Sequence, residues 1–357
     1  MPERSEKKPQ RYLTLDAFRG FVMLMLVSHG FGFGELESGS AFGFLARQFE
    51  HVEWEGGVFW DMVQPSFLFI AGAAMPFAFA IRAQQGAAFP EQAKHVAMRS
   101  LKLVLLSQIL MSVERGEPHF QLINVLSQIA FTYFLTFWIL QLKWKLQAVT
   151  GLGLLVVHTA LFLIFPGPGG PFSREGNIGQ VIDQAVLGYT YPGFYVTINF
   201  LSSTVTTLIG AWTGRLLLES TSMTKTMMRL VEGAVVSFLM VFAFWALIPG
   251  VKRIWTATFT FYSAGWVLLI LLTFYYVIEG LGFRKWTFPL VVIGANSIFI
   301  YSVSILLHDW LSESLAVFTG GFTFVGELAP VFQSCAVLLV LWLLNYFLYK
   351  RRVFIKV

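Results

Sequence analysis

The sequence predicts an all-α integral membrane protein, a polytopic bundle of about ten transmembrane helices. Of its 357 residues, 56% are hydrophobic and only 13% are charged, roughly half the charged share of a soluble domain. Apolar runs of about 18 to 24 residues recur along the whole chain, and a helix needs that length to cross the hydrocarbon of a bilayer. These two observations set the fold class.

Ten apolar runs give the predicted spans. They cover residues 15–34, 61–83, 97–113, 122–142, 146–165, 195–218, 231–248, 258–281, 288–308 and 329–349. Because most of the segments between them are short, the whole chain, residues 1–357, is predicted to be a single transmembrane domain.

The first span follows a basic tail, residues 1–12, and is longer than the apolar core of a signal peptide. No A-x-A cleavage site follows it, so we expect a retained helix. Basic residues collect on the cytoplasmic side of membrane proteins, which predicts that the tail and the C-terminus both lie in the cytoplasm. Only five of the 25 Lys and Arg residues then fall in outer loops: Arg47, Arg115, Arg174, Lys252 and Arg253.

The third span has a short apolar core, from Leu103 to Val113, with Lys102 at one end. If it did not cross, the later loops containing Lys143 and Arg284 would move to the outer side. That would reverse the charge bias, so we predict that this span crosses the membrane.

Two predicted outer segments are long, residues 35–60 and residues 166–194. The second is rich in Gly and Pro, and its stretch "IGQVIDQAVLG" predicts a short helix lying against the bundle. Long loops on one side of a protein often build a site together, so we expect both segments to contribute to the site.

Common signatures of soluble enzymes are missing from the sequence. There is no P-loop, GxGxxG, H-E-x-x-H or GxSxG, and Cys335 is the only cysteine. A disulfide framework and a thiolate metal site are therefore excluded, and no bound metal is predicted. We also find no internal repeat with matching broken helices, which disfavours an inverted-repeat transporter.

Several polar residues lie within or next to the spans, where a charge costs about 3 kcal/mol or more at a helix centre. Asp16 and Arg19 are three residues apart, so they either pair with each other or leave Arg19 to meet an anion such as phosphate. Arg215 ends the sixth span and either extends to the membrane surface or binds a ligand. Asn296 and Ser297, within the ninth span, form interhelical hydrogen bonds or contact substrate.

The strongest cluster of titratable groups surrounds His51. Glu50 and Glu53 flank it, Trp54 follows three residues later, and Asp61 begins the second span ten residues later. A carboxylate can fix the tautomer of an imidazole, which a general base or an acyl-accepting nitrogen requires. The alternative is an interfacial segment with its tryptophans in the aromatic belt and its acids in water.

Five sequence blocks in order resemble the heparan-alpha-glucosaminide N-acetyltransferase family in its bacterial form. They are "LTLDAFRGF", "HVEWEGGVFWDMVQPSFLFIAGAAMPF", "NVLSQIAFTYF", "TINFLSSTVTTLIGAWTGRLL" and "FPLVVIGANSIFIY". The resemblance implies a multi-helix acyltransferase of the bacterial inner membrane, which takes acetyl-CoA from the cytoplasm and acetylates an amino sugar or glycan on the periplasmic side. The family's active histidine falls on His51, its acid on Asp61, and its N-S pair on Asn296 and Ser297.

The chain also departs from the family pattern at three places. Ser28, followed by His29, replaces an asparagine found in many members, Gln128 replaces a charged residue, and "PGF" at residues 192–194 lacks a carboxylate. These differences leave the identity of the acceptor open.

Acyl transfer across the membrane is the leading hypothesis, and it gives roles to the polar residues. His51 acts as general base or as a transient acetyl carrier, Asp61 holds its ring, and Asn296 or a backbone N–H binds the oxyanion. The residues predicted to contact acetyl-CoA are Arg19, Arg215, Arg99 and Arg284. The residues predicted to contact the acceptor are Trp54, Ser28, His29 and Ser297.

The alternative function is a proton-coupled sugar or solute transporter, with His51 and Asp61 as a proton relay. The expected partners are acetyl-CoA, an amino sugar or glycan acceptor, and membrane lipid. A homodimer is left open, and no nucleic-acid partner is expected.

Overall fold

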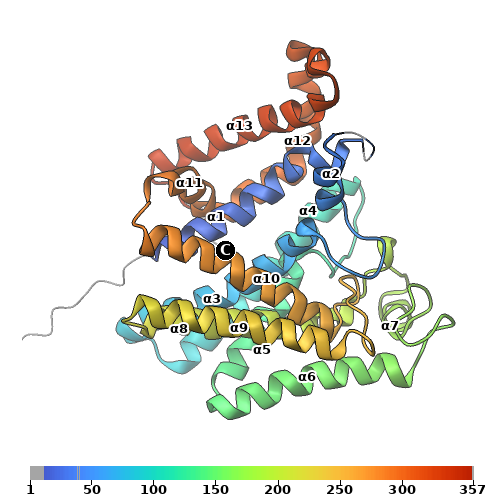
Figure 1. Cartoon of the computed structure of the whole chain (residues 1–357), viewed down its shortest axis with the longest axis vertical. Helices are drawn as coiled ribbons and strands as arrows, with labels where there is room; N and C mark the ends of the chain where they lie inside the picture. Colours follow the sequence, from blue (N-terminus) through green and yellow to red (C-terminus); the bar gives the residue numbers. More distant parts are fainter. Residues whose placement is uncertain (1–11, 38, 40, 356–357) are drawn as a thin grey trace, which may run out of the picture.

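The computed structural model describes residues 12–37, 39 and 41–355. Residues 1–11 of the predicted cytoplasmic tail lie outside this range. The described part is helical and contains no β-strand, only isolated backbone bridges. Its long helices lie side by side, with α12 and α13 at one edge of the bundle and α6 at the other (Figure 1).

The α-helices have the following bounds: α1 Leu13–Val27, α2 Gly43–Phe49, α3 Val63–Gln84, α4 Phe89–Arg115, α5 Val125–Leu140, α6 Trp144–Ile164, α7 Ile178–Leu187, α8 Phe200–Glu219, α9 Met223–Phe244, α10 Ala257–Tyr275, α11 Phe288–Ala295, α12 Ser297–Thr319 and α13 Ala329–Lys350. Short 3-10 or π-helical turns join several of them: η1 His29–Glu35, η2 Phe59–Met62, η3 Pro192–Phe194, η4 Thr197–Asn199, η5 Tyr276–Gly280, η6 Lys285–Thr287 and η7 Gly320–Leu328.

The protein is a multi-pass membrane protein. Seven helical stretches of the described chain are long and apolar enough to cross a bilayer, and α1 with η1, which meet at 45°, makes an eighth if they form one span. One of the seven runs from Ser297 to Lys350 and holds both α12 and α13. Outward-facing apolar side chains, such as Val149 on α6 and Phe242 on α9, are exposed as lipid contact requires.

Each of the ten predicted spans overlaps a helix. The third span, which has a short apolar core, lies within α4, and α4 is 27 residues long. The prediction was wrong about the ends of several spans. The helices α4 and α9 begin at Phe89 and Met223, eight residues before the predicted starts. The first helix stops at Val27, because His29 to Gly32 adopt left-handed backbone angles. The ninth is broken at Asn296, between α11 and α12, and continues to Thr319. The number of crossings and the cytoplasmic side of the termini stay predictions.

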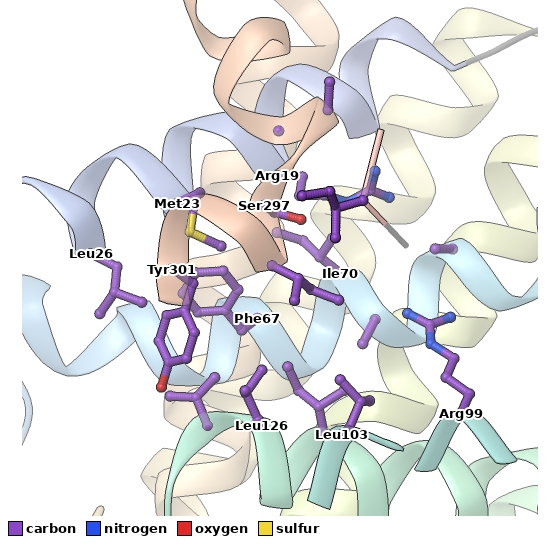
Figure 2. Close-up of a pocket in the computed structure, with 18 of the residues that line it drawn as sticks. Arg19, Met23, Leu26, Phe67, Ile70, Arg99, Leu103, Leu126, Ser297 and Tyr301 are labelled. Atoms are coloured by element: carbon purple, nitrogen blue, oxygen red, sulfur yellow. The ribbon is translucent and has the colours of Figure 1, made fainter. Parts of the chain in front are cut away.

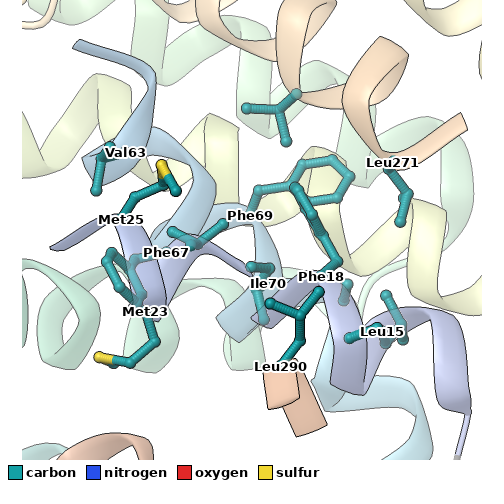
Figure 3. Packing of buried hydrophobic residues seen from close by; sticks show 14 of the residues in the cluster. Leu15, Phe18, Met23, Met25, Val63, Phe67, Phe69, Ile70, Leu271 and Leu290 are labelled. Carbon is teal, nitrogen blue, oxygen red and sulfur yellow. The ribbon is translucent and has the colours of Figure 1, made fainter. Parts of the chain in front are cut away.

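The centre of the bundle is held together by very close helix contacts. A Cβ added to Gly72 of α3 would lie 1.9 Å from the carbonyl oxygen of Thr207 on α8. Likewise, a Cβ added to Gly20 of α1 would lie 1.9 Å from the carbonyl oxygen of Leu290 on α11. Glycines let membrane helices approach backbone to backbone. Around these contacts, large apolar side chains such as Phe18 pack between α1, α3, α10 and α11 (Figure 3).

We expect Gly72→Leu to prevent the protein from folding. Its side chain would meet the backbone of α8, which cannot move aside as a flexible side chain can, so the cost should reach about 3 kcal/mol or more. The yield of monodisperse protein on size-exclusion chromatography in detergent measures this. Gly153→Leu on α6 is the control, because a Cβ at Gly153 meets nothing within 4 Å. Equal yields of the two variants would contradict the close α3–α8 packing.

Because consecutive long helices alternate in direction, the segments before α3, α8 and α10 gather at one end of the bundle, which we call the outer end. The helices α2 and α7 lie at this end (Figure 1). The helix α7, whose N-terminus is capped by Asn177, confirms the short helix predicted in the second long segment. The two long segments touch where the Trp54 indole N–H donates to the carbonyl of Phe172, at 2.9 Å.

Candidate functional site

Three titratable side chains meet at the outer end. The Nδ1 atom of His51 lies 2.7 Å from Oδ1 of Asp61, and Nζ of Lys252 lies 3.1 Å from the same oxygen. The side chains of Asp61 and Lys252 are only 1% and 6% exposed, whereas that of His51 is 43% exposed. The cluster therefore presents the imidazole to the surface and keeps the charged pair beneath it.

Local backbone structure places the carboxylate of Asp61. Asp61 lies in the 3-10 turn η2, and its Oδ2 accepts a hydrogen bond from the backbone N–H of Val58, at 3.2 Å. This return bond to the start of the helix is the second half of a capping box. With Oδ2 occupied in this way, Oδ1 is directed at His51 and Lys252.

A second backbone contact brings Lys252 to the site. Glu55 and Val251 form an isolated antiparallel bridge, and the N–H of Gly56 donates to the carbonyl of Gly250, at 2.8 Å. Gly56 has φ +107°, a conformation that favours glycine. The bridge joins the segment of His51 to the connection between α9 and α10.

The hydrogen bonds determine which nitrogen of His51 is available. Carboxylates only accept, so Nδ1–H donates to Asp61 and Nε2 keeps its lone pair. Lys252 is also a donor, so its 3.2 Å separation from Nδ1 is a close approach and its hydrogen bond goes to Asp61. The buried ammonium and carboxylate compensate each other's charge. This arrangement can take a proton, or carry an acyl group, on Nε2.

A cavity of about 410 Å³ runs between α1, α3, α4, α5 and α12. Arg19 and Arg99 lie at one end of it, and Leu26 and Tyr301 lie at the other (Figure 2). The wall between is largely apolar, and along α3 it extends from Phe67 to Arg82, a rise of roughly 22 Å.

The cationic end of this cavity holds donors without partners. Arg82 donates through Nη2 to His95, at 2.5 Å, while its Nη1 and the Nε of Arg99 are buried with no hydrogen-bond partner in the described residues. The Arg99 guanidinium also lies 4.6 Å from the centre of the Tyr133 ring. Unpaired buried donors are costly and rare, and guanidinium groups suit phosphate. This end therefore fits a phosphorylated anion.

The structure separates the predicted donor-site residues into two groups. Arg19, which pairs with Asp16, and Arg99 both line the cavity, as does Ser297. Arg215 and Arg284 are outside it and pair with Glu219 and Glu279 instead. The sequence prediction missed Arg82 and His95, which flank the short turn between α3 and α4. The available signal was their spacing, since His95 lies four residues before Arg99 on α4 and Arg82 lies just before the turn.

Asn296 is not brought to His51. Its amide donates to the carbonyl of Val353 and accepts from the N–H of Ile355, both at 2.9 Å, and thereby holds the C-terminal segment. Ile355 lines the cavity. Asn296 follows the end of α11, which packs beside the first turns of α1 through Gly294, whereas His51 is at the outer end. Asn296 is therefore not placed to bind an oxyanion beside His51, contrary to the prediction.

The residues predicted to contact the acceptor have different surroundings. Ser28 bonds within its own turn, to the carbonyl of Met25 and the N–H of Phe31. Trp54 joins the two long outer segments through the bond to Phe172. His29 stacks its ring on that of His308, with ring centroids 3.6 Å apart and an interplanar angle of 3°. Of these, only His29 lines a cavity at the outer end.

Two curated proteins are similar to the chain over nearly its whole length. No protein-family model matches the chain. Heparan-alpha-glucosaminide N-acetyltransferase of Mus musculus is 22% identical over 100% of this chain, and that of Homo sapiens is 23% identical over 98% of it. The chain spans about three fifths of the length of these curated relatives, 62% and 60% respectively. Over its whole length, the chain is thus a distant relative of heparan-alpha-glucosaminide N-acetyltransferase.

Proposed function

We propose that this protein is a transmembrane acyltransferase that moves the acetyl group of acetyl-CoA to an amino sugar or glycan acceptor. The cavity is the observation that carries the proposal. At one end it has buried guanidinium donors with no partner in the described part of the chain, and it has a long apolar wall. Coenzyme A has the same division, with phosphates at one end and an extended arm bearing the thioester. The names of the relatives supply the reaction class.

In this proposal the phosphates of acetyl-CoA bind at Arg82, Arg99 and Arg19, and the pantetheine arm extends along α3. The thioester then lies near Leu26 and Tyr301, toward the outer end. The protein is proposed to reside in a bacterial inner membrane with the guanidinium end of the cavity facing the cytoplasm, in keeping with the charge bias of the loops.

At the outer end, His51 handles the proton or the acetyl group. In direct transfer, the acceptor amine attacks the thioester carbon, the C–S bond breaks, CoA leaves as thiolate, and His51 Nε2 takes the amine proton. In the two-step route, Nε2 attacks the thioester carbon, the C–S bond breaks and CoA leaves as thiolate. The amine then attacks the acetyl-imidazole, the C–N bond to Nε2 breaks, and Nε2 takes up the amine proton. In both routes Asp61 stabilises the positively charged ring.

One layer of aromatic side chains lies between the His51 cluster and the end of α1. The rings of His51 and Trp60 are 6.3 Å apart, and those of Phe49 and Trp60 are 6.0 Å apart. Both Phe49 and Trp60 reach Gly30, where an added Cβ would lie 2.7 and 3.4 Å from them. His51 is thus close to the turn that carries His29, and the proposed reaction takes place around this layer.

We expect Arg99→Gln to raise the Michaelis constant for acetyl-CoA about tenfold or more, because a hydrogen bond to a charged group contributes about 1.5–3 kcal/mol. Steady-state kinetics with purified protein at varied acetyl-CoA measure it. Arg215→Gln is the matched control, since Arg215 is exposed and pairs with Glu219. If both variants keep the wild-type constant, phosphate binding at Arg99 is ruled out.

Sealed vesicles test the direction of transfer. With labelled acetyl-CoA on the side of the guanidinium groups, the proposal expects acetyl label on an acceptor supplied from the other side, without net movement of the acceptor. Acceptor accumulation without acetylation would instead indicate the transporter alternative.

A further inference from the structure

The chain turns back toward the bundle after α13. The N–H of Val353 donates to the carbonyl of Leu348, at 3.0 Å, and the N–H of Arg352 donates to that of Tyr349, also at 3.0 Å. These two bonds, with a left-handed residue between them, form a Schellman motif at the end of the helix. The left-handed residue is Arg352, whose φ is +56°. Residues 353–355 follow this turn, and we call them the strap.

The left-handed turn at Arg352 is strained. Glycine usually occupies this position at the end of a helix, because a side chain disfavours a positive φ. Another residue keeps such a conformation where the surrounding structure enforces it, and residues of this kind are frequent at functional sites. The contacts of the strap therefore hold the turn in place, and Asn296 supplies two of them.

Asn296 binds the strap as a neighbouring β-strand would. Its Nδ2 donates to the carbonyl of Val353, and its Oδ1 accepts from the N–H of Ile355, both at 2.9 Å. These two backbone groups belong to residues two apart, so they lie on the same edge of an extended segment. Because Asn296 is completely buried, water does not compete for these bonds, and the amide fixes the position of the strap.

The strap forms part of the wall of the cavity of about 410 Å³, which we call the inner cavity. Ile355 lines this cavity together with Gly294 and Ser297. A Cβ added to Gly294 would lie 3.0 Å from the carbonyl oxygen of Asp16 on α1. Arg19 follows Asp16 by three residues and lines the same cavity, so the strap borders its guanidinium end.

The strap exposes apolar side chains. Val353 and Ile355 are 45% and 43% exposed. A segment with exposed side chains opens at a smaller free-energy cost than the packed helices around it. A ligand that extends along the inner cavity from the guanidinium groups would cover Ile355.

We propose that the strap closes over acetyl-CoA in the inner cavity and that Asn296 is the positioning residue that holds it closed. The strap opens to admit the donor, Ile355 then packs on the pantetheine arm next to the phosphates, and CoA leaves when the strap opens again. The inference deepens the proposed function and rests on it, since the donor must occupy the inner cavity. It gives the buried amide of Asn296 a role in donor binding.

The release of CoA tests this inference. We expect Asn296→Ala to speed the dissociation of CoA from detergent-purified protein about tenfold or more, because two hydrogen bonds no longer hold the strap closed. A variant that ends at Arg352 removes the strap without changing Asn296, and it should release CoA equally fast. Stopped-flow displacement of a fluorescently labelled CoA measures both. Release at the wild-type rate in either variant would overturn the inference.

Asn345→Ala is the matched control. The buried amide of Asn345 donates to the carbonyls of Val292 and Ile293, at 3.0 and 3.2 Å, so these bonds tie α13 to α11 and not to the strap. CoA should leave this variant at the wild-type rate. If it leaves as fast as from Asn296→Ala, loosening of α11 explains the effect and the inference fails.

Access to the inner cavity can be measured without CoA. Cys335, the only cysteine, is replaced by alanine, and Ala74→Cys places a thiol on the α3 wall of the cavity. We expect a water-soluble maleimide to label this thiol about tenfold faster when Asn296→Ala is added. Faster labelling supports the strap even if CoA does not bind, in which case only the proposed function fails. Unchanged labelling overturns the strap, whatever the activity.

Discussion

We expect His51→Ala to abolish acetyl transfer while the protein stays folded and binds acetyl-CoA. The His51 side chain is 43% exposed, and its Nδ1 is committed to Asp61, which leaves Nε2 for the reaction. Alanine removes both a general base and any acetyl carrier. A positioned base alone contributes about 10²–10⁴-fold in rate, so turnover should fall by at least that factor.

The remaining properties of the variant should be close to wild type. The His51 side chain is 43% exposed and does not line the inner cavity, so its loss leaves neither a deep void nor a damaged donor site. Initial rates with labelled acetyl-CoA, together with calorimetric binding of CoA, measure both expectations. His119→Ala is the control, a histidine of the outer end that lines neither cavity. Turnover that survives in folded His51→Ala would remove His51 from the reaction.

The pairing of His51 with Asp61 was accessible from the sequence because both residues belong to one short stretch that ends in a span. Lys252 was not, since it follows Asp61 by 191 residues and reaches it only through the Glu55–Val251 bridge. Charge counting classed Lys252 as one more outer-loop residue. Local spacing therefore predicted two members of the cluster, and tertiary contact supplied the third.

The arginines illustrate a different limit. Hydropathy places Arg99, Arg215 and Arg284 near the same side of the membrane, but it does not determine which way each side chain faces. A nearby acid could have distinguished two of them, but the prediction did not use it: Glu219 lies four residues from Arg215, and Glu279 lies five from Arg284. Paired exposed arginines are satisfied without a ligand, whereas Arg99 points into the inner cavity.

The helices were predictable because the bilayer sets their length, but the break in the ninth span was not. Nothing in an apolar run indicates that α11 ends at Ala295, or that Asn296 turns its amide to the C-terminal segment. The glycines after His29 did carry a signal for the end of α1. Alternating Gly30 and Gly32 permit the left-handed turn that carries His29 to the cavity at the outer end.

The second large effect should appear when the buried pair beneath His51 is broken. Asp61→Asn leaves the Lys252 ammonium buried without a counter-charge, and Lys252→Met leaves the carboxylate in the same position. Removing one partner of a buried pair costs about 3–5 kcal/mol. Each single variant should therefore show a clearly lowered midpoint of thermal unfolding in detergent, while Asp309→Asn, at a side chain that is 97% exposed, should not.

The double variant Asp61→Asn with Lys252→Met distinguishes stability from catalysis. Because it removes both charges together, most of the lost stability should return, so the two effects will not add. Acetyl transfer should stay low, since a neutral amide no longer stabilises the charged imidazole of His51. Strictly additive losses would show that Asp61 and Lys252 do not act as a pair. Recovery of both stability and turnover would instead assign the carboxylate a structural role, with His51 working unaided.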